Sequence, residues 1–207
     1  MASEVDLCNL ALSHLGQSRQ ITAISPPDGS SEAAICARFY PIARNTVLEA
    51  AYWGFATKRV ALADLGTPPD AWAYRYAWPN EALHIQALYV DTDDTEQEFA
   101  IEADASGTVI YSNTEDAMVR YTALITDVNK YGGLVQQAIT HMLAAHLAGP
   151  IIKGKAGMAV SESMLNKSLG WQGKAELHNA KGQAKQVKAE PGYQAVRVQT
   201  PSIRARS

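Results

Sequence analysis

Hydrophobic positions recur at helical spacing over the first fifty residues, which predicts two helices. The first covers residues 3–16, with Ser3 suited to cap its N-terminus, Asp6 three residues further on, and Gly16 suited to end it. Its apolar positions share one face: Val5, Cys8, Leu12 and Leu15. The prolines and glycine of residues 25–31 then predict a turn or loop.

The second predicted helix runs from Ser31 to Tyr52. Its apolar stripe is expected at five positions: Ile35, Phe39, Ile42, Thr46 and Ala50. Pro41 lies inside this helix and leaves the carbonyl of Ala37 without its usual donor. Because the apolar periodicity continues on both sides of the proline, we expect a bend and not a break.

After Gly54 the pattern changes to the alternation that is typical of strands. Six segments are predicted to be extended: residues 58–66, 72–79, 84–90, 98–104, 108–113 and 117–125. Hairpin turns are expected at 91–98 and 105–108. The sequence therefore predicts a small antiparallel sheet inserted between helical regions.

Helical spacing returns at about Lys130 and is expected to end at the motif LAGP, residues 147–150. Its core positions are Val135, Ala138, Ile139, Met142 and Ala145. A flexible joint is expected at 151–159, followed by a polar helix over 159–188. The thin apolar stripe of that last helix comprises Met164, Leu165, Leu169, Trp171 and Leu177. Three glycines lower the intrinsic stability of this helix, so it should need to pack against another helix.

These elements predict an α+β fold: a bundle of about four helices, an inserted small antiparallel β-sheet subdomain and an extended C-terminal tail. Residues 1–55 and 129–188 form the bundle, 56–128 the sheet subdomain and 189–207 the tail. The tail holds two prolines, three arginines and few residues to bury, so alone it should be extended or disordered.

Charge is distributed unevenly along the chain. The net charge is −3, but residues 153–207 hold ten Lys and Arg against three Asp and Glu, a net charge of +7. Residues 1–152 carry −10. The basic end is either a solvated helix face with a frayed tail or a segment that folds onto a partner. Apolar anchors stand among its arginines: Tyr193, Val196, Val198 and Ile203.

The cysteines, the first residues and the length of the apolar runs bear on the cellular compartment. Cys8 and Cys36 are far apart, which favours two buried thiols in a reducing compartment. Glu4 and Asp6 stand where a secretory signal would be basic, and no apolar run has transmembrane length. We therefore expect a soluble protein without a membrane partner.

The sequence does not support enzyme chemistry, and we expect no catalytic site, metal or cofactor. His141 and His146 are five residues apart, so they do not share a helix face, and we interpret them as satisfied helix histidines. No phosphate loop, dinucleotide fingerprint or nucleophile elbow follows a predicted strand.

An acidic stretch within residues 91–98 allows three interpretations. Its first four carboxylates are Asp91, Asp93, Asp94 and Glu96. They could hold calcium, although the loop lacks the glycine and glutamate of a calcium-binding loop. They could form a solvated hairpin tip, or a ring of such loops could repel DNA phosphates in a channel.

A row of aromatic residues also has two interpretations. Trp72, Tyr74, Tyr76 and Trp78 alternate along one predicted strand and would share its face. They could stack nucleic-acid bases, but only Arg75 is near, on the opposite face. A sheet core or a subunit contact is the favoured interpretation.

Three stretches together resemble the tail tubular protein A family of tailed phages, the head-to-tail adaptors of short-tailed phages. They read NLALSHLGQ, ARFYPIARNTVLEAAYWGFATKRVALA and WAYRYAWPNEALHI. The shared order is an early Leu-Gly helix end, a second helix ending in W-x-F-A, and aromatic strands leading to Pro79 and Leu83. Glu81 fits the acidic residue that often follows that proline. The resemblance covers roughly residues 5–150.

The resemblance implies a structural role in the virion. Such adaptors form a ring, usually of twelve subunits, between the portal protein and the tail nozzle or tail tube. The helical part would pack against neighbouring copies around the DNA channel, and the sheet part would face the tail. Genomic DNA would pass through without sequence-specific binding. The expected location is the head–tail junction, after synthesis in the host cytoplasm.

The resemblance also implies roles for particular residues. By position, the C-terminal segment would grip the portal with six residues: Tyr193, Val196, Arg197, Val198, Ile203 and Arg204. Independently of the resemblance, Trp53 and Phe55 stand where the pattern changes from helix to strand, so they are expected to fill the junction between helices and sheet. The acidic loop would face the channel or the tail.

Two alternatives from other classes stay open. One is a virion-associated peptidoglycan hydrolase using carboxylates such as Glu49, Asp64 or Glu81. The other is a DNA-binding accessory protein that uses the basic C-terminal end.

Overall fold

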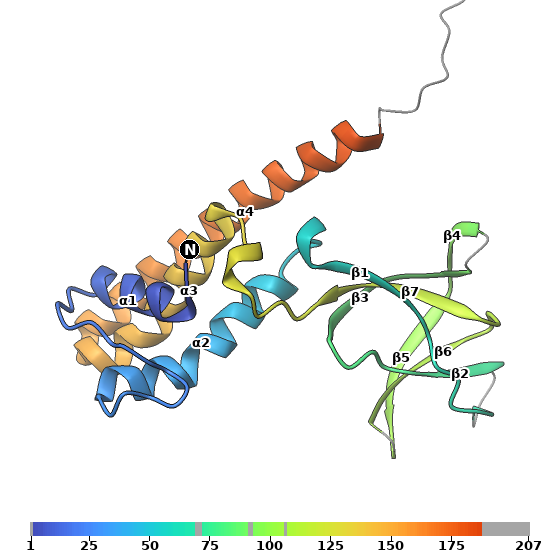
Figure 1. The fold of residues 1–207 in the computed structure, drawn as a ribbon, viewed down its shortest axis with the longest axis horizontal. Helices are drawn as coiled ribbons and strands as arrows, with labels where there is room; N and C mark the ends of the chain where they lie inside the picture. The colour runs from blue at the N-terminus through green and yellow to red at the C-terminus, as the bar shows by residue number, and fades with distance from the viewer. Residues whose placement is uncertain (1, 69–71, 91–92, 106, 188–207) are drawn as a thin grey trace, which may run out of the picture.

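The protein consists of a helical module and a sheet module at opposite ends of an elongated molecule (Figure 1). The structure is a computed structural model and describes residues 2–68, 72–90, 93–105 and 107–187. It has four α-helices and two small antiparallel sheets, which confirms the predicted α+β class. The portal-binding residues expected in the tail, from Tyr193 to Arg204, lie outside the described residues.

The helical module is built around one central helix. Its helices are α1 (Glu4–His14), α2 (Ser31–Glu49), α3 (Gly133–Ile152) and α4 (Gly154–Val187). Helix α3 is apolar on nearly every side and packs against α1, α2 and α4. A helix that is hydrophobic all round must be buried, and α3 is accordingly buried from Ala138 to Ala145.

Helix α1 follows its sequence prediction. The Ser3 hydroxyl accepts the N–H of Asp6 at 3.1 Å, and the Asp6 carboxylate accepts the N–H of Ser3 at 2.8 Å, which completes the expected capping box. Cys8 of α1 and Cys36 of α2 are both free and buried. A hydrogen bond with Cys36, together with burial, raises the pKa of the Cys8 thiol, so this thiol is poorly reactive.

The apolar stripe predicted for α2 is only partly right, since Ile35 and Phe39 are half-buried against the core but the other three positions are exposed. The buried positions are shifted along the helix: Ala33, Cys36, Tyr40, Ala43, Val47 and Leu48. Ile42 is 48% exposed, and Thr46 and Ala50 are exposed too. Small residues such as Ala33, Cys36 and Ala43 make up much of the buried face, and α2 packs against α3. The spacing of large hydrophobic residues does not reveal such a face. Pro41 faces solvent and the helix continues through it, ending at Glu49 instead of Tyr52.

The flexible joint predicted at 151–159 is a tight corner. Helix α3 continues through Pro150 to Ile152, and α4 begins at Gly154. Lys153 and Gly154 both have φ of 61°, and the Lys153 N–H donates to the carbonyl of Gly149 at 3.1 Å. A Cβ atom at Gly157 would lie 3.0 Å from the Ala148 carbonyl oxygen, so the corner depends on close packing at a glycine. Helix α4 then returns antiparallel along α3.

The sheet module contains two sheets instead of the single predicted one. Its strands are β1 (Thr57–Ala61), β2 (Tyr74–Ala77), β3 (Ala82–Val90), β4 (Asp93–Gln97), β5 (Phe99–Asp104), β6 (Gly107–Ser112) and β7 (Ala117–Ala123). One sheet has the order β1-β7-β3-β4 and the other β2-β6-β5, all antiparallel. Buried residues of both sheets, such as Leu88 and Ile110, share one hydrophobic core. One sheet alone would leave that apolar face in water.

The acidic stretch at 91–98 is mostly strand: the predicted hairpin is present, because β3 and β4 pair antiparallel with Val90 opposite Asp93, but the stretch is not a long loop. Asp93, Asp94 and Glu96 belong to β4, the edge strand beside β3, while Asp91 lies outside the described residues. The pairing of β3 with β4 is irregular between Leu88 and Val90. Acidic residues on an edge strand discourage pairing with another chain, which gives this stretch a structural reason.

Candidate interaction surfaces

Aromatic rings fill the boundary between the two modules. Trp53 is 1% exposed, and its indole N–H donates to the carbonyl of Val47 at 3.0 Å. The ring centroid of Phe55 lies 6.1 Å from that of Trp53 and 5.9 Å from that of Tyr131. These rings join the end of α2, the short helix η1 (Gly54–Ala56) and the segment before α3. They fix the start of β1 relative to the bundle.

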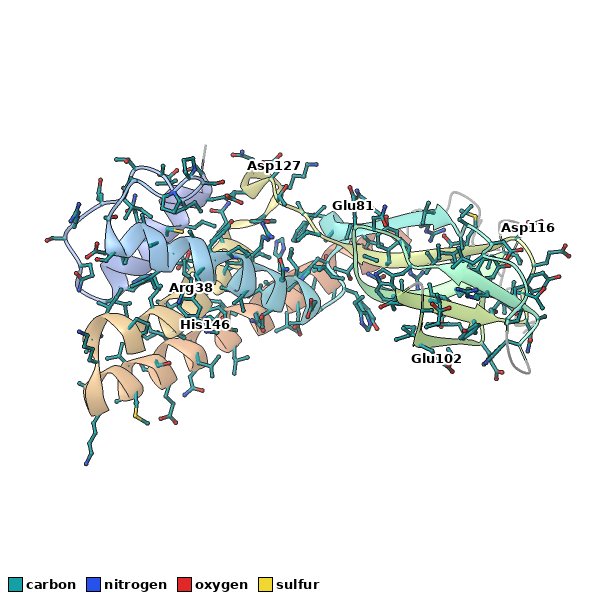
Figure 2. The ribbon with its side chains drawn as sticks, turned by 90° about the horizontal axis from the view of Figure 1, so that it is seen from below. Arg38, Glu81, Glu102, Asp116, Asp127 and His146 are labelled. Atoms are coloured by element: carbon teal, nitrogen blue, oxygen red, sulfur yellow. The ribbon has the colours of Figure 1, made fainter. Side chains whose placement is uncertain are left out.

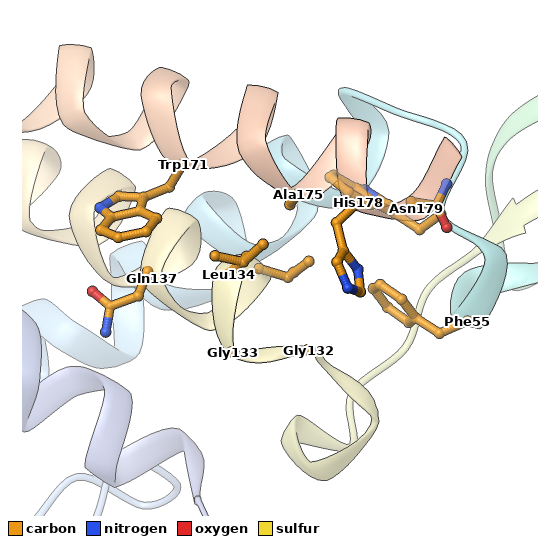
Figure 3. A pocket seen from close by; sticks show the side chains of 11 residues that line it. Phe55, Gly132, Gly133, Leu134, Gln137, Trp171, Ala175, His178 and Asn179 are labelled. Atoms are coloured by element: carbon orange, nitrogen blue, oxygen red, sulfur yellow. The ribbon is translucent and has the colours of Figure 1, made fainter. Parts of the chain in front are cut away.

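A cavity of about 540 Å³ opens beside these rings (Figure 3). Its walls include Phe55, Leu134, Trp171 and Ala175, and His178 extends from α4 toward Phe55 at its edge (Figure 3). The volume and the mainly apolar walls fit a small ligand or a protruding side chain. Among the described residues, no Asp, Glu, Lys or Arg lines this cavity. A ligand would therefore be selected by its shape and not by its charge.

Asn179 links α4 to the boundary between the modules. Its amide donates to the carbonyl of Tyr52 at 2.8 Å, and its carbonyl oxygen accepts the N–H of Gly54 at 3.1 Å. A side chain far along α4 thereby holds the link that leads into the sheet module. The sequence analysis missed Asn179, because a lone asparagine in a polar helix carries no pattern.

The stripe predicted for α4 is only partly the buried one. Met164 is buried and Trp171 half-buried, but Leu165, Leu169 and Leu177 are 40%, 51% and 64% exposed. The side against α3 is formed mainly by small and polar residues, with Met164 as the one large apolar side chain among them: Gly157, Ser161, Met164, Ser168, Gln172 and Ala175. The alanines of α3 bring the two helices close together, so large side chains are displaced to the flank.

Serine hydroxyls reinforce this close contact between helices. Ser161 donates to the carbonyl of Ala145, and Ser168 to the carbonyl of Ala138, each at 2.8 Å. Ser168 is fully buried. A buried hydroxyl needs such an acceptor, so these serines belong to the interface and not to a catalytic site.

The histidines pack against aromatic neighbours in the bundle. The His141 ring donates from Nδ1 to the carbonyl of Gln137 at 2.8 Å and lies 4.5 Å from the His14 ring. His146 stacks on Phe39 at 5.6 Å, on the side of the bundle where Figure 2 places Arg38. Burial lowers the pKa of His146, and burial with the nearby His141 and Lys167 lowers the pKa of His14.

The carboxylates suggested for catalysis have structural partners or stand apart. Asp64 accepts the N–H of Gly66 at 2.8 Å, and Glu81, at the boundary between the modules (Figure 2), pairs with Lys58. The Lys58 ammonium lowers the pKa of Glu81, and Glu81 raises the pKa of Lys58. Glu49 is exposed at the end of α2. The three carboxylates lie on separate segments of the chain: Glu49 ends α2, Asp64 lies between β1 and β2, and Glu81 lies just before β3.

The acidic strand and the aromatic row also have structural contacts. Glu96 of β4 forms an ion pair of 3.2 Å with Arg120 of β7. Tyr74 and Tyr76 stack at 6.1 Å, and the buried Tyr76 hydroxyl donates to the carbonyl of Thr114 at 2.6 Å. Residues 2–187, apart from their gaps, contain no cluster of three or more His, Cys, Asp or Glu that could hold a metal.

No protein-family model matches this sequence, and no curated protein matches it. Within the described part of the chain, no helix combines the length and hydropathy needed to cross a lipid bilayer.

Proposed function

We propose that this protein is a structural virion component, a head-to-tail adaptor that forms a ring between the portal protein and the tail nozzle or tube. The ring has twelve copies by analogy with the family that residues 5–150 resemble. Genomic DNA passes through the ring during packaging and ejection without sequence-specific binding. The protein acts at the head–tail junction after synthesis in the host cytoplasm.

One observation carries the proposal: the long helix α4 exposes several large apolar side chains on a module that lies opposite the sheet module. Met158, Leu165, Leu169 and Leu177 are the large apolar side chains that are exposed in the part of α4 whose side chains the structure describes. Three of them, Met158, Leu165 and Leu169, fall on one side of the helix at about 100° per residue, and exposed apolar patches are typical of protein–protein contact sites. A molecule with two distinct ends and such a helix is suited to joining other proteins. In the proposed ring, the bundle packs beside neighbouring copies and the sheet module faces the tail.

The C-terminal segment completes the proposal. Residues 189–207 carry apolar anchors among arginines and little that could form a core. A segment of this composition can order when it binds a partner, at an entropic cost. We assign the portal contact to it, with Tyr193, Val196, Arg197, Val198, Ile203 and Arg204 as contact residues.

The test uses the portal protein encoded in the same genome. The full chain should attach to the purified portal as a ring, seen by electron microscopy. A chain without residues 190–207 should keep its circular-dichroism spectrum and lose attachment.

Full-length variants refine the test. Serine at the four apolar anchors should abolish attachment, whereas glutamine at Arg197 and Arg204 should weaken it and make it less sensitive to salt. Attachment by the truncated chain would show the tail assignment to be wrong. If the full chain does not attach to the portal, the adaptor function is wrong.

A further inference from the structure

Helix α4 has two exposed flanks of opposite character. At about 100° per residue, Lys167, Lys174 and Lys181 fall on one side, which we call the lysine flank. The apolar-acidic flank lies on the other side and consists of Met158, Glu162, Leu165, Leu169 and Glu176. All eight side chains are exposed, and the line that packs on α3 lies between the two flanks.

The two flanks adjoin different parts of the bundle. Lys167 and Lys174 border a cavity of about 450 Å³ with His14 of α1 and Trp171, and the Lys174 ammonium lies 4.3 Å from the centre of the Trp171 ring. Glu176 borders a different cavity together with Glu49 at the end of α2. One flank is therefore basic on the α1 side, and the other is acidic and apolar on the α2 side.

The charges on the two flanks have the same spacing. Glu162 and Glu176 are fourteen residues apart, as are Lys167 and Lys181, and each span is roughly 21 Å along a helix. Two α4 helices side by side and parallel can thus form both ion pairs at once. The lysine stems would cover Leu165 and Leu169, since long basic side chains bury their methylenes on apolar surface while the ammonium stays in water.

We infer that the apolar-acidic flank of α4 binds the lysine flank of α4 in a second copy of this chain. The contact is heterologous, because each copy offers a different surface to each neighbour, and such contacts close into rings or grow into filaments. This inference rests on the proposed function for its ring geometry. The partner is a second copy because the same helix supplies the charge of opposite sign at the same spacing.

The test uses two full-length variants with reversed charges. E162K/E176K makes both flanks basic, and K167E/K181E makes both acidic. Sedimentation equilibrium of the wild-type chain should show a mass that rises with concentration, with Kd at or below about 1 mM. Each variant alone should associate at least about tenfold more weakly, because like charges face each other.

An equimolar mixture of the two variants should restore wild-type association. In a mixed, alternating assembly every contact again joins an acidic flank to a basic one. Variants that had only lost stability would not regain association on mixing. The control E98K/E102K changes the charge by the same amount on exposed residues of the sheet module and should associate like the wild type. Circular dichroism checks that each variant is folded.

Three outcomes would overturn the inference: a monomeric wild-type chain up to that concentration, reversed variants that associate normally, or a mixture without rescue. The last would mean that another occupant, such as the C-terminal segment, covers the flank. Portal attachment is measured separately. A chain that associates through its flanks but does not attach to the portal keeps this inference and removes the adaptor function.

Discussion

Buried polar atoms show how single residues hold this fold. The Trp53 indole, the Ser168 hydroxyl and the Tyr76 hydroxyl each donate to a backbone carbonyl. Each bond avoids the cost of a buried unsatisfied donor, about 1–3 kcal/mol. His14 differs, because its Nε2 atom is buried without a hydrogen-bond partner in the described structure.

The environment of His14 predicts a pH effect on stability. Its folded-state pKa is lowered, so near pH 6 the unfolded chain binds more protons than the folded chain. The free energy of unfolding should therefore decrease as the pH falls below about 6.5, the ordinary histidine value. Urea unfolding at pH 7.5 and 5.5 measures this change.

The variant His14→Gln isolates the contribution of this residue. It should lose less stability than the wild type over the same interval, whatever its absolute stability. His84→Gln serves as the matched control, since His84 is exposed and contacts Tyr52 at the surface. Equal pH dependence in the wild type and His14→Gln would contradict the prediction.

At the scale of elements, glycines in α4 have two different roles. Gly157 lies at the corner between α3 and α4, where an added Cβ would meet a backbone oxygen of Ala148. Gly170 is exposed inside the same helix, and nothing lies within 4 Å of a Cβ there. The same substitution should therefore have opposite effects at the two positions.

Gly170→Ala should stabilise the protein by about 0.5–1 kcal/mol, since glycine is a poor helix former. Gly157→Ala should destabilise it by about 1 kcal/mol or more, because overpacking against backbone outweighs that gain. Urea unfolding of both variants measures the difference. Stabilisation by both substitutions would show that the helix corner is looser than the structure indicates.

Helix ends and helix faces were predictable to different degrees. The capping box of α1 follows from Ser3 and Asp6 alone, because capping is local. The buried face of α2 does not follow from local sequence, because the small residues Ala33 and Ala43 are buried while the larger Ile42 stays exposed. Helix α4 repeats this result with Ser168 inside and Leu169 outside.

At the scale of the whole molecule, the two modules form an elongated body with a continuous hydrophobic core. The chain passes between the modules beside Trp53 and Tyr131, and Asn179 ties α4 to the first of these crossings. The bundle and the sheets offer two separate ends for different partners, as the proposed connector function requires.

If the protein is the proposed connector, it should bind duplex DNA weakly, because its channel must release the genome. With a net charge of −3, we expect a Kd weaker than about 100 μM at low salt and a shallow dependence of log K on log salt. Fluorescence anisotropy with a labelled duplex over a salt series measures both. Tight binding with a steep slope would instead support the DNA-binding accessory protein.

The sequence by itself determined the α+β class, the order of the four helices and of six of the seven strands in the described residues, and the capping of α1. These follow from periodicity and from contacts between residues a few positions apart. Only the tertiary structure decided the division into two sheets, the tight α3–α4 corner, the hydrogen bonds from Asn179 to Tyr52 and Gly54, and the exposure of the α4 leucines. Those features depend on contacts between segments that are far apart in the sequence. Small residues such as Gly157 and Ser168 lie at the close contact between α3 and α4, but they produce no hydrophobic pattern from which that contact could be predicted.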